Sequence, residues 1–194
     1  VLKFAAKHFE GRVPEPGELR DIDREILAQV EAGFERVGGL LAAVRLRDAL
    51  SETMGLAREV NGYLDRAPWF KVIKEDRQAA ATTIYTALRC IDNLKTLFAP
   101  FLPFTSQQVH EFLGYEGQLF GEQRIETFHE SERAHSALTY DPTGAIGHWE
   151  PSGLRPGQVL REPVALFRKL EPELIEAERA RLGQPREAET EPRR

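Results

Sequence analysis

Apolar residues recur at three- and four-residue steps through the first part of the chain, a pattern that predicts amphipathic helices. The first predicted helix spans residues 21–41, and its apolar side carries Ile22, Ile26, Val30, Phe34, Val37 and Leu41. The second runs from Leu46 to about Ala67 with the stripe Leu46, Leu50, Thr53, Ala57, Val60 and Leu64. Pro68 ends this helix, because proline disfavours helical geometry at the preceding residue, and Trp69 therefore emerges just past the helix end.

Two further helices follow before residue 115. Asp76 is the expected N-cap of a long helix whose apolar positions are Ile84, Leu88, Ile91, Leu94 and Phe98, with Pro100 and Pro103 interrupting it. A short helix is expected from Thr105, paired with Gln108 in a capping box, to Gly114. Residues 3–9 resemble the end of a helix that begins upstream of Val1.

The pattern changes after residue 116. Residues 117–161 mix glycine, proline and histidine with isolated aromatic residues and show no sustained period, which predicts a loop region. Residues 172–182 predict a last, charged helix, and the residues after Gly183 a disordered tail. The expected divisions are a helical bundle at 1–115, an irregular insertion or loop region at 116–163, a return segment with a helix at 164–183, and the tail at 184–194. The fold class is all-α, an antiparallel helix bundle with an irregular C-terminal extension.

Composition and charge narrow the function classes. A formal net charge of -5 over 194 residues argues against a general nucleic-acid coat protein, so any RNA site must be local. The single cysteine, Cys90, excludes an internal disulfide framework and fits a buried structural thiol. The chain has no run of about 20 apolar residues and no secretory signal, so a cytoplasmic location with no membrane partner is expected. Its start indicates a piece cut from a longer chain.

The most informative segment is Asn61-Gly62-Tyr63-Leu64-Asp65-Arg66-Ala67-Pro68-Trp69, followed by Lys71 and Lys74. A tryptophan at a helix end can stack on an unpaired base, and an asparagine side chain can read a base edge. Arg66, Lys71 and Lys74 can contact phosphates. The alternative interpretation is a tryptophan packed in the core under a turn, with the lysines as solvated surface charge.

This segment resembles the Asn-x-Tyr…Pro-Trp motif of methionyl-tRNA synthetases. Residues 7–14 (Lys-His-Phe-Glu-Gly-Arg-Val-Pro) resemble that family's Lys-x-Phe-(Asp/Glu)-Gly-x-(Val/Ile)-Pro segment, and residues 164–170 its Pro-Leu-Phe-x-Lys ending. Residues 99–105 resemble a Pro-x-(Leu/Met)-Pro segment that the valine, isoleucine and leucine enzymes share. The matching order covers residues 1–115 and identifies the chain as a relative of the family's anticodon-binding domain.

The resemblance implies a partner and a set of site residues. Trp69, supported by Pro68, would stack on the first anticodon base of tRNA(Met), the cytosine of CAU. Asn61 and Arg66 complete the expected anticodon-binding set, and Lys71 and Lys74 the phosphate contacts. An Asn and an Arg that also read the anticodon in the family should lie upstream of Val1. The parent enzyme would attach methionine to tRNA with ATP and magnesium, and its catalytic domain would be a partner of this chain.

No catalytic residue is expected here, since the chain has neither a His-x-Gly-His motif nor a Lys-Met-Ser-Lys-Ser loop, and we expect it to be inactive alone with no cofactor of its own. No metal site is expected either: His129, His135 and His148, among acidic residues at 126, 130 and 132, are interpreted as solvated loop residues. Asp92 and Asn93 are interpreted as an exposed helix flank, and Trp149 as a packing anchor. Alternative functions are the anticodon domain of another class I synthetase, a protein-interaction bundle without an RNA role, and a stand-alone enzyme.

Overall fold

The computed structural model describes residues 1–67, 69–167 and 170–182, which fall into two units, Val1–Pro163 and the described residues from Val164 onward. The first unit contains α1 (Leu2–His8), α2 (Asp21–Glu31), α3 (Gly33–Ala42), α4 (Leu46–Arg66), a 3-10 helix η1 (Val72–Lys74), α5 (Arg77–Phe98), α6 (Pro103–Phe112), β1 (Glu122–His129) and β2 (Ala134–Asp141). The second contains α7 (Pro172–Arg181), the last helix expected from the sequence. The predicted tail at 184–194 lies outside the described residues.

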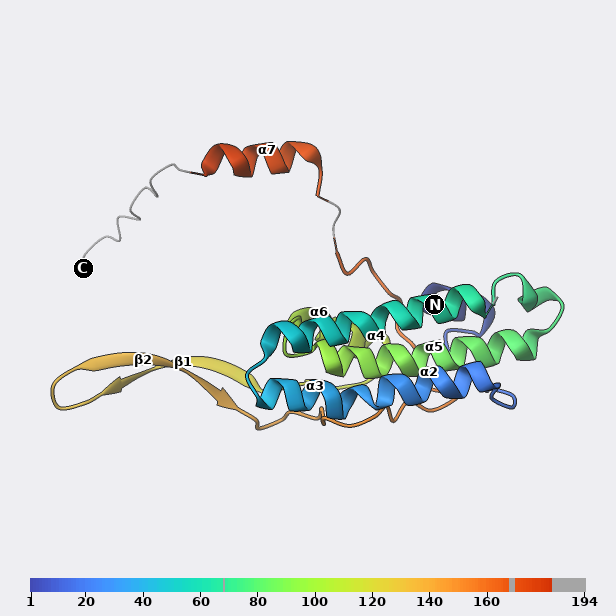
Figure 1. Cartoon of the computed structure of the whole chain (residues 1–194), viewed down its shortest axis with the longest axis horizontal. Coiled ribbons are helices and arrows are strands. Elements are labelled where there is room, and N and C mark those ends of the chain that lie inside the picture. The colour runs from blue at the N-terminus through green and yellow to red at the C-terminus, as the bar shows by residue number, and fades with distance from the viewer. Residues whose placement is uncertain (68, 168–169, 183–194) are drawn as a thin grey trace. The chain divides into compact units, whose positions relative to one another are not determined.

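The first unit is the helix bundle predicted from the sequence. In Figure 1, α2 and α3 follow one another along a common line and lie alongside α4 and α5. The helix α5 contacts α2, α3, α4 and α6, and thereby forms the centre of the bundle. No helix in the described part of the chain combines the length and the apolar character needed to cross a bilayer.

The single helix predicted over residues 21–41 is two helices, α2 and α3, separated by Ala32. Gly33 begins α3 and is buried against α4: a Cβ placed there would lie 2.5 Å from a methyl carbon of Leu56. A larger residue at position 33 would therefore displace the Leu56 side chain. The periodicity could not reveal the break, because both helices present apolar residues to the same neighbour.

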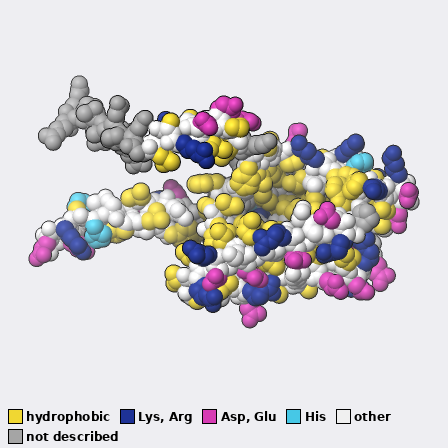
Figure 2. Space-filling view, turned by 45° about the horizontal axis from the view of Figure 1, so that its top comes forward, with side chains coloured by type: hydrophobic (Ala, Val, Ile, Leu, Met, Phe, Trp, Pro, Cys, Tyr) yellow, Lys and Arg dark blue, Asp and Glu magenta, His cyan; other side chains and the backbone are white. Residues whose placement is uncertain are grey.

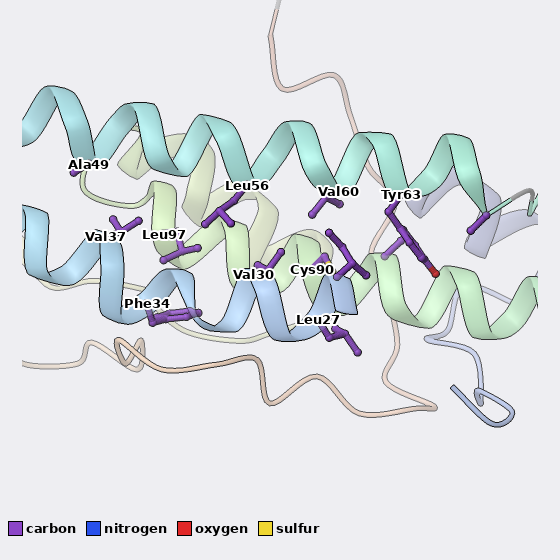
Figure 3. Close-up of a cluster of buried hydrophobic side chains, with 13 residues drawn as sticks. Leu27, Val30, Phe34, Val37, Ala49, Leu56, Val60, Tyr63, Cys90 and Leu97 are labelled. Carbon is purple, nitrogen blue, oxygen red and sulfur yellow. The ribbon is translucent and has the colours of Figure 1, made fainter. Parts of the chain in front are cut away.

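The stripe predicted for α4 is confirmed at Thr53 and Val60, which are buried, and wrong at Leu46 and Leu50. Leu46 and Leu50 are 55% and 39% exposed, and the buried line of α4 instead runs through Ala49, Thr53, Leu56, Val60 and Tyr63. Figure 3 shows the labelled side chains of this line meeting those of α2, α3 and α5. Tyr63, part of the motif that the sequence singled out, therefore belongs to the core.

The first turns of α5 and α6 are capped differently. The predicted cap of α5 is confirmed, since the Asp76 carboxylate accepts a hydrogen bond from the Ala79 N–H at 2.9 Å. The capping box predicted at Thr105 is wrong: α6 begins at Pro103, the N-cap is Leu102, and no side chain caps the helix. Proline at the first helical position needs no partner for an N–H it lacks, so the helix can start without one.

The interpretation of Asp92 and Asn93 as an exposed flank is wrong, because both side chains are buried. The Asp92 carboxylate pairs with the Lys95 ammonium and accepts hydrogen bonds from the Tyr115 hydroxyl (2.9 Å) and the Ser152 hydroxyl (2.5 Å). The Asn93 carbonyl oxygen accepts from the Ser152 N–H at 2.6 Å. These contacts attach the long segment after α6 to the middle of α5.

The expectation of no strand in residues 117–161 is also wrong. The strands β1 and β2 form an antiparallel hairpin that pairs Glu122 with Asp141 and His129 with Ala134. Apolar residues do alternate on one face, where Ile125 lies opposite Leu138, but these side chains remain 78% and 67% exposed. Among the described residues of the first unit, the hairpin side chains are mostly exposed, so burial imposes no clear alternation on the sequence.

A buried polar link joins α2 to α4. The Tyr63 hydroxyl, in a fully buried side chain, donates to Asp23 Oδ1 at 2.7 Å, and Arg20 binds both oxygens of the same carboxylate at 2.7 and 2.8 Å. Burial alone would raise the pKa of Asp23, but the hydrogen bonds from Arg20 and Tyr63 outweigh it, and the pKa lies below its ordinary value of 3.8. The carboxylate is therefore held in its charged form.

We expect the substitution Tyr63→Phe to lower the free energy of unfolding by about 1.5–3 kcal/mol, because it removes a buried hydrogen bond to a charged acceptor. Urea denaturation of the purified chain measures this change. The matched control is Tyr85→Phe, since the Tyr85 hydroxyl makes no hydrogen bond to the described residues. A loss as small as that of the control would show that the Tyr63 hydroxyl contributes nothing.

The low pKa of Asp23 predicts a pH dependence of stability. A carboxyl group whose pKa is lower in the folded than in the unfolded state stabilises the fold above the unfolded value and ceases to do so as the pH falls through the folded value. The free energy of unfolding should therefore decline as the pH falls below about 5, where the Asp23 carboxyl of the unfolded chain begins to bind a proton. The variant Asp23→Asn, less stable at neutral pH, should show a shallower decline, and an equal slope in both proteins would contradict the prediction.

Candidate nucleic-acid interface

The candidate interface lies where α4 gives way to α5. The helix α4 ends at Arg66, with the Ala67 N–H still bonded to the Tyr63 carbonyl at 2.8 Å, and Trp69 follows before η1 turns the chain into α5. The predicted emergence of Trp69 just past a helix end is confirmed. Pro68, the predicted support of this tryptophan, lies outside the described residues.

Trp69 combines features of both interpretations that the sequence left open. Its side chain is partly buried and packs on the cluster of core residues formed by α1, α5 and the segment after α6. The indole meets the Phe4 ring of α1 edge to face, with ring centroids 4.5 Å apart and an interplanar angle of 89°. A ring that rests on the core through one contact and reaches solvent elsewhere is held in a defined orientation, as a stacking platform requires.

Phe70 is a second aromatic group at this surface that the sequence analysis missed. Its side chain is 56% exposed, its ring lies 5.5 Å from that of Trp69, and the Lys71 ammonium is 5.8 Å from its centroid. The available signal was an aromatic residue directly after Trp69, outside any helical period and next to a lysine. An exposed phenylalanine beside a cation presents a flat face and a positive charge together.

The other predicted residues are all exposed, but they do not form one cluster. Asn61 and Arg66 are five positions apart on α4, which places them about 140° apart around the helix and on different faces. The Arg66 guanidinium lies back along α4 near Gly62. Lys71 and Lys74 lie on the connection to α5, in the same short segment as Trp69 and Phe70. The structure thus groups Trp69, Lys71 and Lys74 and leaves Asn61 on the side of α4.

The basic residues here carry free charge. No carboxylate of the described residues lies within 4.0 Å of the side-chain nitrogens of Arg66, Lys71 or Lys74, whereas other cations of the first unit are paired, among them Arg20, Arg36, Arg89 and Lys95. Figure 2 shows Lys and Arg side chains and a histidine, together with Asp and Glu side chains, at the end of the bundle where α4 connects to α5. Exposed Asp65, Glu75 and Asp76 lie in the same stretch of the chain, so the excess of positive charge is small, but Arg66, Lys71 and Lys74 are not held in ion pairs with described residues.

The buried thiol predicted for Cys90 is confirmed, and it has no nucleophilic character. The side chain is fully buried, and burial, reinforced by the Glu31 carboxylate, raises the pKa of the thiol to about 12. The thiol therefore stays protonated at neutral pH. Nucleophilic attack needs the thiolate.

The three histidines that were weighed as metal ligands lie outside this interface. His129 and His135 are exposed strand residues of the hairpin rather than loop residues, and His148 is exposed in the segment that follows. The His135 ring stacks near Phe128 with centroids 5.7 Å apart, and its Nδ1 lies 3.7 Å from the Glu130 carboxylate. Within the described ranges, no three His, Cys, Asp or Glu residues come together as metal ligands would.

Trp149 is the packing anchor predicted from the sequence. Its indole N–H donates to the Phe34 carbonyl oxygen at 3.0 Å, and its ring meets the Phe34 ring edge to face at 5.5 Å. It thereby fastens the segment after the hairpin to α3. The two tryptophans of the chain have different surroundings, one on the core of the bundle beside free cations and one in a backbone contact.

Two solved structures of methionyl-tRNA synthetase from Mycobacterium tuberculosis share the fold. The protein bound by methionyl-adenylate aligns over 86% of this chain and 29% of that one with a TM-score of 0.66. The apo form aligns over 88% and 30% with a TM-score of 0.67, and the sequence identity is 24% in both cases. At this identity the likeness is one of fold.

Relatives of higher sequence identity show the family as well as the fold. The methionine–tRNA ligases of Thermomicrobium roseum and Chloroflexus aggregans are 52% and 51% identical to the chain over 94% of its length, while the chain spans 31% and 30% of theirs. A model of the family described as "Anticodon binding domain of methionyl tRNA ligase" matches residues 13–141, and thus extends through the β-hairpin. The chain belongs to the methionyl-tRNA ligase family and contains its anticodon-binding domain.

Proposed function

We propose that this chain recognises the CAU anticodon of tRNA(Met) and that Trp69 stacks on the first base of that triplet. The observation that carries the proposal is a partly exposed indole, fixed by Phe4, beside an exposed phenylalanine and lysines without acidic partners. Bases of an anticodon loop are unstacked and can be received by aromatic side chains. Each such stack contributes about 1–3 kcal/mol to binding.

The surrounding residues take complementary roles in this proposal. Lys71 and Lys74 contact phosphates of the loop, since they share the segment that carries Trp69. Arg66 and Asn61 approach the loop from α4, where the exposed Asn61 amide can both donate to and accept from a base edge. Phe70 supplies a second apolar surface for the nucleotide next to the stacked one. Pro68, which lies outside the described residues, belongs to the proposed set as the residue directly before Trp69.

The domain serves a larger reaction. The relatives are named methionine–tRNA ligases, and we propose that the enzyme carrying this domain attaches methionine to its tRNA with ATP and magnesium. No residue of this chain is assigned to ATP, methionine or the metal ion. The helical residues 1–115 would read the RNA, residues 116–163 would brace the bundle through Trp149 and Ser152, and residues 164–183 would contact the catalytic domain.

The first test compares two RNA stem-loops that differ only in the order of the same three bases, CAU and UAC. The wild-type chain should bind the CAU stem-loop more tightly, and Trp69→Ala should reduce its affinity for CAU by about 5- to 150-fold and abolish the difference. Trp149→Ala, which removes the other tryptophan, should keep the discrimination. Equal binding of both triplets by the wild-type chain would refute the anticodon assignment.

A spectroscopic version does not depend on substituting Trp69. In the variant Trp149→Phe, Trp69 is the sole tryptophan, and its fluorescence should be quenched as the CAU stem-loop is added, because stacking brings a base against the ring. Unchanged fluorescence at saturating RNA would show that the indole stays away from the bases.

The second test concerns Phe70. Because its side chain is 56% exposed, Phe70→Ala should change the free energy of unfolding by less than about 0.5 kcal/mol, yet weaken binding of the CAU stem-loop at least about 5-fold. Phe104→Ala is the matched control, since Phe104 is 82% exposed on α6. If both variants bind RNA like the wild-type chain, Phe70 has no part in recognition.

A further inference from the structure

A groove of about 510 Å³ lies between α1 and the segment 160–163. The wall on α1 is formed by Lys3, Ala6 and Lys7, and the opposite wall includes Arg161. The segment is fixed by backbone hydrogen bonds from Leu160 N to the Gly11 carbonyl (2.7 Å) and from Arg161 N to the Phe112 carbonyl (2.9 Å). The groove is therefore built by two elements held in place, rather than by a surface loop.

The cations of this groove are unneutralised. Lys3, Lys7 and Arg161 are exposed, and no carboxylate of the described residues lies within 4.0 Å of their side-chain nitrogens. Elsewhere in the first unit, exposed arginines such as Arg24 and Arg45 are held by a neighbouring aspartate. The groove contains one acidic side chain, Glu162, against three basic ones, so its formal charge is positive in a chain whose net charge is -5.

The helix α1 connects this groove to the candidate interface. Phe4 on α1 touches Trp69, whereas Lys3 and Lys7 lie about 60–100° from Phe4 around the helix, on the side facing the groove. Trp69 and Arg161 thus flank the same two-turn helix, which is about 10–12 Å in diameter with its side chains. If one base of an RNA strand stacks on Trp69, the neighbouring nucleotides must either pass over α1 or point away from the protein.

We propose that the groove formed by Lys3, Lys7 and Arg161 binds backbone phosphates of the anticodon arm next to the nucleotide stacked on Trp69. The proposal rests on the proposed function, because it takes the RNA from that site. Two ammonium groups one turn apart suit phosphates as point charges, and a guanidinium can bind one phosphate through two N–H groups. Ala6 leaves the wall between the lysines free of bulk.

The test is the triple variant Lys3→Gln/Lys7→Gln/Arg161→Gln, whose substituted side chains are all exposed, so that it should fold like the wild-type chain. Its affinity should fall for the CAU and the UAC stem-loop by the same factor, because phosphate contacts carry no sequence information. The plot of log affinity against log salt concentration should become shallower by about 2 to 3, that is, by about 0.7–0.9 for each phosphate contact removed.

The control removes three positive charges elsewhere in the first unit, through Arg47→Gln/Arg124→Gln/Arg133→Gln. This variant should keep the wild-type dependence of log affinity on log salt concentration. If both triple variants lowered this slope equally, the change would follow from the lower net charge alone, and the proposal would be overturned. An unchanged slope in the groove variant would also overturn it, even if the wild-type chain discriminates the triplets. Equal affinity of the wild-type chain for the CAU and UAC stem-loops would instead refute the anticodon assignment. The salt slopes of the variants would still show whether the groove binds phosphates.

Discussion

The rotation of α4 about its own axis is fixed by Tyr63, whose hydroxyl reaches the buried carboxylate of Asp23 across the bundle. A helix with apolar residues on two adjacent lines could present either of them to the core. The line through Tyr63 is buried, and the link to Asp23 and Arg20 is satisfied only in that orientation. With Tyr63 inside, Asn61 and Arg66 must face solvent, and the end of α4 delivers Trp69 toward α1. The surface proposed for RNA thus depends on a buried hydrogen bond that takes no part in it.

The helix α1 organises that surface. Through Ala5 and Phe9 it joins the core, through Phe4 it supports the indole of Trp69, and with Lys3 and Lys7 it lines a positive groove. Arg77 at the start of α5 holds it from the other side, donating to the His8 carbonyl at 2.6 Å and lying 5.0 Å from the centre of the Phe9 ring. A seven-residue helix gains little stability by itself. Its position is therefore set by these tertiary contacts, which couple the aromatic and the basic parts of the surface.

The end of α4 and the start of α5 were predicted from neighbours in sequence, although the equally local capping box expected at Thr105 was wrong, and features that depend on distant partners were not predicted. The limits of α4 and α5 follow from an aspartate cap and from prolines, whose effects are local, so the sequence sufficed. The buried Asp92 carboxylate is hydrogen-bonded by Ser152, 60 residues away, and no residue near Asp92 in the sequence predicts that partner. The hairpin was missed because its alternating apolar residues, Ile125 opposite Leu138 among them, are exposed and the apolar signal is short. For Trp69 the two interpretations, core or platform, were posed as exclusive, whereas a half-buried ring has both properties. The place of Phe70 at the interface was not predicted, because a single exposed aromatic residue produces no periodic pattern in the sequence.

The acidic balance of the chain and an RNA-binding role are compatible because of how its cations are placed. Arginines along α2, α3 and the hairpin are matched by carboxylates two or three positions away or across the bundle, as in the pairs Arg24–Asp21 and Arg36–Glu52. Such pairs contribute little to stability, but they cancel the potential that would attract phosphates to the sides of the bundle. Within the described residues, no carboxylate lies within 4.0 Å of the side-chain nitrogens of the cations around Trp69 and along α1, and the same holds for Arg47 and Arg58 on α4. Formal net charge sums paired and unpaired cations and hides this difference between them.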